Sequence, residues 1–208
     1  ELRHHFRHMG VVQTMVCQLS RLPDCPAELE AVAAERNRRA GESFAAYAEL
    51  LYRDAGIVGT VLDSSVARDD PVLALIPGRV MRLFQMGPAI QRLLKECDSY
   101  RELLRSYQES LDRAVRQDGF VGVKSHLAEE IGFAVEPVTE AEADAAFPAA
   151  RAGSSDAYRQ VYVAVFAATL LQCQELGVPV HLHSGITGGL WNGPISNADP
   201  FLLVPLIR

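Results

Sequence analysis

Residues 177–189 read GVPVHLHSGITGG, and this stretch is the strongest indication of the fold. A short apolar run ends in two histidines, His181 and His183, and glycines follow at once. Side chains alternate along a strand, so both imidazoles are expected on one face, about 6 to 7 Å apart. The glycines allow the backbone to turn tightly beside an occupied site. The pattern predicts a buried parallel strand whose carboxyl end carries functional groups.

A second stretch, GFVGVKSH at residues 119–126, places a lysine in a run that otherwise has the pattern of a buried strand. An ammonium group is costly to bury without a partner, so Lys124 is expected to have a specific use. It could form a Schiff base, pair with a substrate carboxylate, or react with carbon dioxide to give a carbamate that bridges two metal ions. A snorkelling or salt-bridged lysine at a strand end is the structural alternative.

Helical and strand patterns alternate along the rest of the chain. Strands are predicted at residues 57–63, 79–86, 120–125 and 178–184. Helices are predicted at residues 26–41, 43–56, 88–119, 139–150 and 156–176, and a further helix is expected to begin at Asp199. Strands separated by helices favour parallel β-α units. Two arrangements stay open at this point, a doubly wound open sheet and a closed barrel.

In either arrangement, functional side chains collect at the carboxyl ends of the strands. Asp63, Lys124, His181 and His183 all stand at such ends. Neutral imidazole is a common zinc ligand, and two imidazoles on one strand face favour a metal site over two unrelated core histidines. Asp63 is either a functional acid or the cap of the turn that follows it.

The long loop before Asp199 supplies candidates for substrate binding. Trp191 and Asn192 could line a pocket, and a tryptophan that only anchors the loop explains Trp191 equally well. Asp199 itself is better explained as a helix cap than as an acid-base residue. The glycines of SGITGG match no phosphate-binding motif, and Ser184 lacks the G-x-S-x-G frame of a nucleophile.

Composition argues against several classes of partner. The 208 residues carry a net charge of −6 with no basic patch, so nucleic acid is not expected as a partner. The longest apolar run, residues 161–171, is shorter than the about 20 residues that cross a bilayer, so no membrane partner is expected. The four cysteines form no C-x-x-C pair, which favours reduced thiols and a cytoplasmic location. A small-molecule substrate is the expected partner, and a homo-oligomer stays open.

Three motifs occur in an order that is found in one enzyme superfamily. GFVGVKSHLAEEIGF begins at Gly119, CQELGVPVHLHSGITGG at Cys173, and NADPFLLVPLIR at Asn197. Their pattern is G-x-K-S, then P-x-x-x-H-[ST]-G, then A-[ND]-P-x-x-L-x-P-L. It resembles the amidohydrolase superfamily, and within it the amidohydrolase-2 type with its nodulin-like branch. The resemblance covers most of the chain from about residue 43 onward, on motif order alone.

The resemblance implies a (β/α)8 TIM-type barrel, of which this chain would hold strands 2 to 5 in a single domain over residues 1–208. It also implies one or two divalent metal ions, with zinc favoured and manganese as the alternative. Lys124 takes the position of a carbamylated lysine on the fourth strand, and His183 that of a metal ligand on the fifth. His181 has no firm counterpart in the family, and we count it as a third candidate ligand.

Lys124 and His183 are therefore the expected catalytic residues of a metal-dependent hydrolase. Such an enzyme would cleave an amide or related C–N bond of a small molecule through a metal-activated water. The first-strand H-x-H of the family is absent and later ligands would lie beyond Arg208, so we expect a piece of a longer protein. Phe84 stands where the branch usually has an acid, which indicates a changed pocket or lost activity. A metal-dependent decarboxylase or isomerase, and a degenerate barrel that serves binding or assembly, stay as alternatives.

Overall fold

The computed structural model describes residues 8–64, 66–67, 69–184 and 195–205. By their contacts the residues divide into two compact units. The first unit is Glu1–Thr60 with Ala67–Val80, and the second is Val61–Val66 with Met81–Arg208. The expectation of a single domain over residues 1–208 stays a prediction.

The first unit is mainly helical. It holds α2, which spans Gly10–Ser20, α3, which spans Leu29–Asp54, and the short η1 at Pro71–Leu75. α3 bends at Ser43, because the backbone there is extended (φ −160°, ψ 104°). The Ser43 hydroxyl accepts a hydrogen bond from the backbone N–H three residues later, as a helix cap does. The extended residue divides α3 into two helical segments that meet at Ser43, where the sequence predicts the second helix to begin.

Four strands form one sheet in the order β1-β2-β3-β4. They span Gly59–Leu62, Arg79–Gln85, Gly122–Ser125 and Val180–Leu182. The pairs β2–β3 and β3–β4 are parallel, as alternating strands and helices predict. Each strand lies within the range that the sequence predicts for it, and the sequence-based assignment of strands is confirmed.

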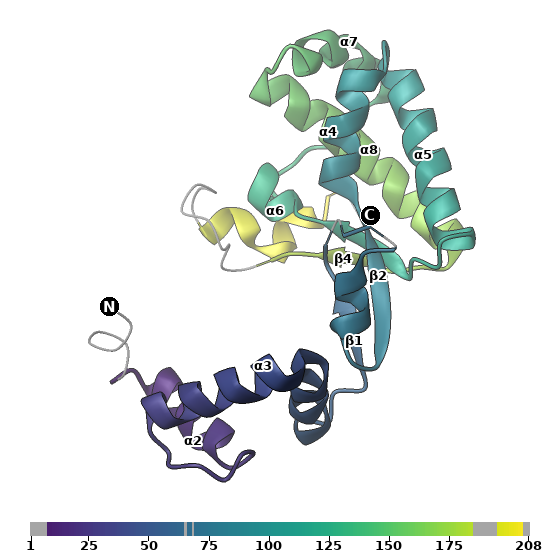
Figure 1. The fold of residues 1–208 in the computed structure, drawn as a ribbon. Helices are drawn as coiled ribbons and strands as arrows, with labels where there is room; N and C mark the ends of the chain where they lie inside the picture. Colours follow the sequence, from purple (N-terminus) through teal and green to yellow (C-terminus); the bar gives the residue numbers. More distant parts are fainter. Residues whose placement is uncertain (1–7, 65, 68, 185–194, 206–208) are drawn as a thin grey trace. The chain divides into compact units, whose positions relative to one another are not determined.

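The prediction of a (β/α)8 barrel, with this chain holding strands 2 to 5, is wrong. The described residues form a four-stranded α/β sheet whose edge strands are β1 and β4 (Figure 1). Alternating strands and helices specify parallel β-α units, but a closed barrel and an open sheet share that local pattern. Closure depends on pairing between the first and the last strand, which a local pattern does not encode.

The second unit adds five helices to the sheet. They are α4 at Met86–Glu96, α5 at Tyr100–Arg116, α6 at Leu127–Glu130, α7 at Glu140–Arg151 and α8 at Ser155–Leu176. Figure 1 shows α4, α5, α7 and α8 grouped together on one side of the sheet. The single helical region predicted between the second and third strands is in fact α4 and α5. They separate because Cys97 has an extended backbone and the Ser99 hydroxyl caps α5.

One face of the sheet packs against these helices. Val123 of β3 is fully buried, and the hydroxyl of Ser125 lies 3.1 Å from the hydroxyl of Tyr162 on α8. Phe84 of β2 packs edge-on against Tyr107 of α5, with ring centroids 5.6 Å apart. Because side chains alternate along a strand, the residues between these point to the opposite face of the sheet.

Side chains cap the starts of α7 and of the C-terminal helical turn. Thr139 and Glu142 form a reciprocal capping box at the start of α7. Two short 3-10 turns follow near the C-terminus, η2 at Ile195–Ala198 and η3 at Pro200–Leu203. The carboxylate of Asp199 accepts a hydrogen bond from the N–H of Phe201 and so caps η3. In the described part of the chain, each helix is too short or too polar to cross a membrane.

Candidate strand-end site

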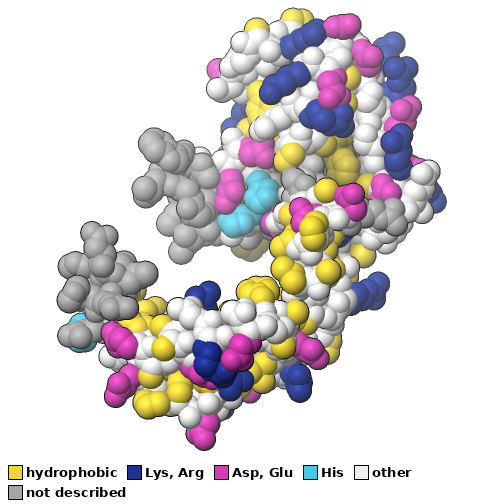
Figure 2. All heavy atoms as spheres, in the orientation of Figure 1, with side chains coloured by type: hydrophobic (Ala, Val, Ile, Leu, Met, Phe, Trp, Pro, Cys, Tyr) yellow, Lys and Arg dark blue, Asp and Glu magenta, His cyan; other side chains and the backbone are white. Residues whose placement is uncertain are grey.

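Side chains from several strand ends meet at one edge of the sheet. Asp63 directly follows β1, Lys124 lies near the end of β3, and His183 directly follows β4. In the strand register, Lys124 stands between Gln85 of β2 and His181 of β4. Figure 2 shows histidine side chains gathered next to acidic ones on the second unit.

Lys124 is paired with Asp63. Its Nζ lies 2.8 Å from Oδ2 of Asp63, and the lysine side chain is only 5% exposed against 32% for the aspartate. Burial raises the pKa of Asp63, but hydrogen bonds from Lys124 and Gln85, together with nearby positive charge, outweigh burial and lower that pKa overall. The aspartate is therefore held as a carboxylate beside the buried ammonium group.

Two histidines, His126 and His183, extend this group of side chains beyond Asp63. His126 Nε2 lies 3.5 Å from Asp63 Oδ2, and the His126 ring stacks on that of His183, with centroids 6.1 Å apart and planes 29° apart. His183 Nε2 in turn lies 3.3 Å from Oε1 of Glu129. We call Asp63, Lys124, His126, Glu129 and His183 the strand-end cluster. Its order in space places two imidazoles between two carboxylates.

The turn after β3 positions half of the strand-end cluster. His126 caps α6, and its carbonyl accepts hydrogen bonds from the N–H groups of Glu129 and of the next residue, at 2.8 and 2.9 Å. The Ser125 hydroxyl accepts a hydrogen bond from the N–H of Leu127, which fixes the start of this turn. The N–H of His183 donates to the Ser125 carbonyl at 3.2 Å. β3, α6 and the end of β4 are thus bonded together around the site.

The sequence did not identify His126 or Glu129 as site residues. Both lie in the motif GVKSHLAEE, and their spacing of three places them on one face of a helical turn. This polar i, i+3 pair directly after a buried strand is the sequence pattern that could have identified His126 and Glu129 as site residues. We expected Asp63 to be either a functional acid or a turn cap, and the structure brings it to Lys124 and His126.

Three further residues were predicted for the site. His181 is an exposed residue of β4, in register with Lys124. Its predicted part as a metal ligand stays a prediction. Trp191 and Asn192, the predicted substrate-binding residues, lie outside the described residues.

Two pairs of donor atoms in the strand-end cluster have the spacing of two ligands on one divalent metal ion. Within the described ranges, no three His, Cys, Asp or Glu side chains form a group that could hold a metal ion. Two ligands of a tetrahedral zinc, each about 2.1 Å from the ion, lie about 3.4 Å apart. The pair His183–Glu129, at 3.3 Å, and the pair His126–Asp63, at 3.5 Å, match that separation. Each pair can therefore supply two ligands of such an ion.

Phe84 belongs to the helix-covered face and not to the site. It packs against Tyr107 and against Phe120, whose ring centroid is 6.5 Å away. The residue of β2 that reaches the strand-end cluster is Gln85, which hydrogen-bonds Asp63. Packing against these two rings accounts for an apolar residue at this position. Whether Phe84 indicates a changed pocket or lost activity stays a prediction.

Comparison with known proteins gives one likeness of fold. No family model matches the chain, and no curated protein matches it. A solved structure from Lactobacillus casei ATCC 334, named as a "putative metal-dependent hydrolase", superposes with a TM-score of 0.59 at 19% sequence identity. The match covers 92% of this chain and 57% of that one. The likeness shows a shared fold, and the resemblance to the amidohydrolase-2 type stays a prediction.

Proposed function

We propose that this protein is a metal-dependent hydrolase and that the strand-end cluster is its reacting centre. The observation that carries the proposal is the row of two imidazoles between two carboxylates at the carboxyl edge of a parallel sheet. The name of the structural neighbour supports the same reaction class. The finer proposal, cleavage of an amide or related C–N bond of a small molecule, is supported by the motifs around Lys124 and His183.

The proposed metal donors are His183 with Glu129, and Lys124 after carbamylation, with His181 as a further candidate. An ammonium group has no lone pair for a metal, so Lys124 as it stands is not a ligand. A carbamate on Lys124 would put a second anion next to Asp63, which is favourable only with a cation between them. We therefore expect carbamylation of Lys124 and metal binding to depend on each other.

The chemistry divides between the metal and the chain. When bound, a divalent metal supplies Lewis acidity and lowers the pKa of a water molecule. His126 is placed to take up a proton, because its Nε2 lies near Asp63 and leaves Nδ1 for a hydrogen-bond partner. The carboxylate of Asp63 stabilises the imidazolium that results, as an acidic partner does for a histidine base in other hydrolases.

Turnover by variants tests this function. We would measure hydrolysis of a panel of small amides with added zinc or manganese, for the wild-type protein, Glu129→Gln and His183→Ala. Both variants are expected to lose about 10² in kcat/KM. Glu109→Gln, which alters an exposed carboxylate on α5, is the matched control and should retain activity. Metal-dependent turnover that survives both cluster variants would contradict the proposal.

His181→Ala separates the two histidines of β4 in the same assay. A loss equal to that of His183→Ala would assign His181 to the metal. Unchanged kcat/KM would remove it from the proposed ligands.

A further inference from the structure

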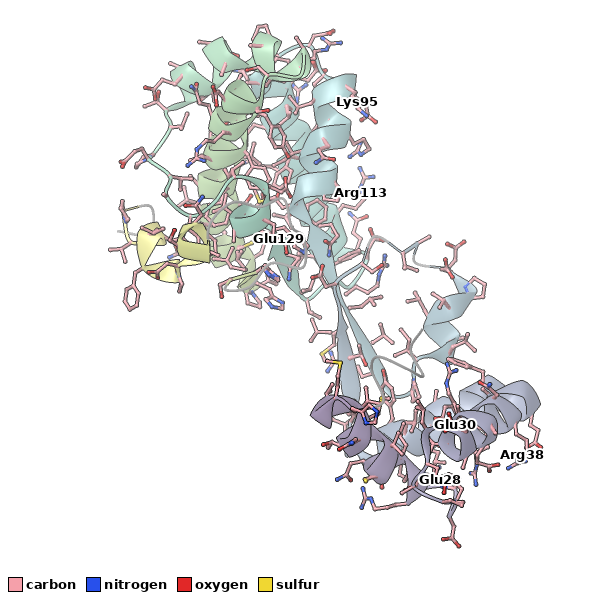
Figure 3. The ribbon with its side chains drawn as sticks, turned by 90° about the vertical axis from the view of Figure 1, so that its left-hand side faces the viewer. Glu28, Glu30, Arg38, Lys95, Arg113 and Glu129 are labelled. Atoms are coloured by element: carbon pink, nitrogen blue, oxygen red, sulfur yellow. The ribbon has the colours of Figure 1, made fainter. Side chains whose placement is uncertain are left out.

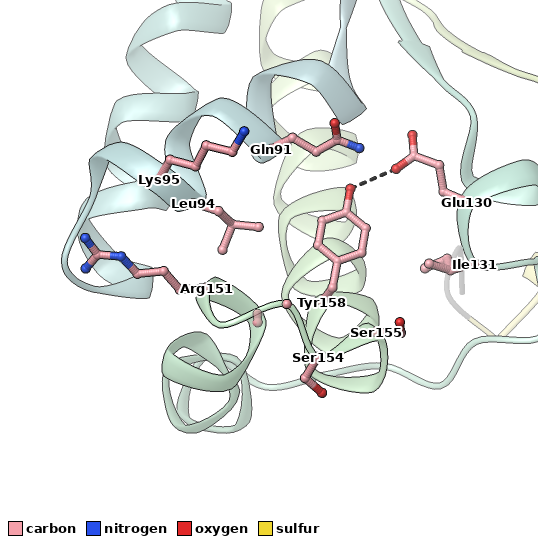
Figure 4. A pocket seen from close by; sticks show the side chains of 11 residues that line it. Gln91, Leu94, Lys95, Glu130, Ile131, Arg151, Ser154, Ser155 and Tyr158 are labelled. Atoms are coloured by element: carbon pink, nitrogen blue, oxygen red, sulfur yellow. Dashed lines mark hydrogen bonds between the residues drawn. The ribbon is translucent and has the colours of Figure 1, made fainter.

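A separate cavity of about 450 Å³ opens in the second unit, between α4, the end of α6 and the turn that joins α7 to α8 (Figure 4). This volume is in the range of sites that bind small molecules, about 300–1,000 Å³. The side chains that matter below are Gln91, Leu94, Lys95, Glu130, Arg151 and Tyr158.

Glu130 forms the acidic end of the cavity. Its Oε2 accepts a hydrogen bond of 2.8 Å from the Tyr158 hydroxyl, which also contacts Gln91 (Figure 4). Its Oε1 lies so close to Gly87 that a Cβ on that glycine would be 2.2 Å away. Among the described residues Glu130 has no ion-pair partner.

Lys95 and Arg151 form the basic end of the cavity. Figure 4 shows both on the side opposite Glu130. Arg151 is held 2.8 Å from Asp98, whereas Lys95 makes no ion pair within the described part of the chain. Lys95 lies near the end of α4 away from the sheet, whereas Glu129 of the strand-end cluster lies beside the sheet (Figure 3).

The start of α8 also lines the cavity. Ser154 caps that helix, with its hydroxyl accepting from Ala157 N–H, and Ser155 lines the cavity at the first helical position. The first N–H groups of a helix carry partial positive charge and favour an anion. The apolar side chain of Leu94 and the ring of Tyr158 lie between the two ends (Figure 4).

We propose that this cavity binds a small zwitterion, an amino acid or a dipeptide with an apolar side chain. The ammonium group of the ligand lies at Glu130, and its carboxylate lies at Lys95. The carbon skeleton packs on Leu94 and Tyr158. The site does not depend on the proposed hydrolase activity.

Calorimetric titration of the full chain tests both charges of the ligand. The probes are L-leucine, the dipeptide Gly-Leu, N-acetyl-L-leucine, which lacks the ammonium group, and L-leucinamide, which lacks the carboxylate. At least one zwitterion is expected to bind, and the affinity of each singly charged analogue should be lower by a factor of about ten or more. No heat from either zwitterion at millimolar concentration, or equal affinity for the analogues, would overturn the proposal.

Variants locate the binding in this cavity. Glu130→Gln removes the acidic charge and keeps the shape, and Lys95→Met removes the basic charge from an exposed position. Each should weaken binding about tenfold or more. Arg92→Met, an exposed change on the same helix outside the cavity, is the control and should leave affinity unchanged. Because Lys95 is exposed, its variant is expected to fold, and wild-type affinity in Lys95→Met would refute the site on its own.

Discussion

Loss of the Asp63 charge is expected to destabilise the second unit more than loss of the Lys124 charge. The Lys124 side chain is 5% exposed and that of Asp63 is 32% exposed. Asp63→Asn therefore leaves an ammonium group that water hardly reaches. Lys124→Met leaves a carboxylate that water can partly solvate, so its cost is smaller.

The magnitude follows from the separation of the two charges. At 2.8 Å they attract by roughly 6 kcal/mol at an effective dielectric constant of about 20, before the desolvation of both groups is subtracted. Removing one partner of a buried pair costs about 3 to 5 kcal/mol. Because Asp63 is partly exposed, we expect about 3 kcal/mol for Asp63→Asn and about 1 kcal/mol for Lys124→Met. The double variant should lie within about 1 kcal/mol of the wild-type protein.

Urea unfolding in a chelating buffer, followed by far-UV circular dichroism, measures these free energies. Amide hydrogen exchange of β3 reports on the second unit alone and serves as an independent probe. The reasoning would be refuted if Lys124→Met cost as much as Asp63→Asn. It would also be refuted if the two costs simply added in the double variant.

Three further outcomes are expected. The pKa of Asp63 is lowered in the folded protein, because hydrogen bonds outweigh burial. The stability that the Asp63 carboxylate contributes is therefore complete above its unfolded pKa of about 3.9 and is lost as the pH falls through its folded pKa. Acid unfolding of Asp63→Asn should depend less on pH in that window than acid unfolding of the wild-type protein. Gly122→Ala should lower the free energy of unfolding by about 2 kcal/mol in urea titration, because its Cβ would lie 2.7 Å from the carbonyl oxygen of Pro179, and an unchanged midpoint would contradict the close approach. Gly87→Ala should lower the melting temperature of the wild-type protein, because the added Cβ would contact Glu130. In a Glu130→Ala background the same change should raise the melting temperature, because only the higher helix propensity of alanine remains. A change of the same sign in both backgrounds would contradict the contact.

Strands and caps were predictable because their signals are local. Each β-branched run lies where a strand lies, and Thr139 with Glu142 forms the capping box that their spacing predicts. The break between α4 and α5 was missed because Cys97 continues an apolar pattern, while the Ser99 cap is visible only once the helix is known to stop. A closed barrel was wrongly inferred from motif order, because a local pattern carries no information on how edge strands pair.

The site was predictable only where a residue stood out against its strand. Lys124 and His183 did so, because a charged or polar group at the end of an apolar run is unusual. His126 and Glu129 were missed because they belong to the cap and the body of α6, a single turn that is too short to show a helical period. The pairing of Lys124 with Asp63 joins β3 to the residue that follows β1, and such a contact depends on the sheet order.

Metal content of the protein tests the central claim most directly. Elemental analysis would be made on wild-type protein and on His183→Ala, both purified without chelator and checked for folding by circular dichroism. The account predicts about one or two equivalents of zinc or manganese in the wild-type protein, lost in the variant. A folded wild-type protein without metal, or equal metal content in His183→Ala, would contradict the account.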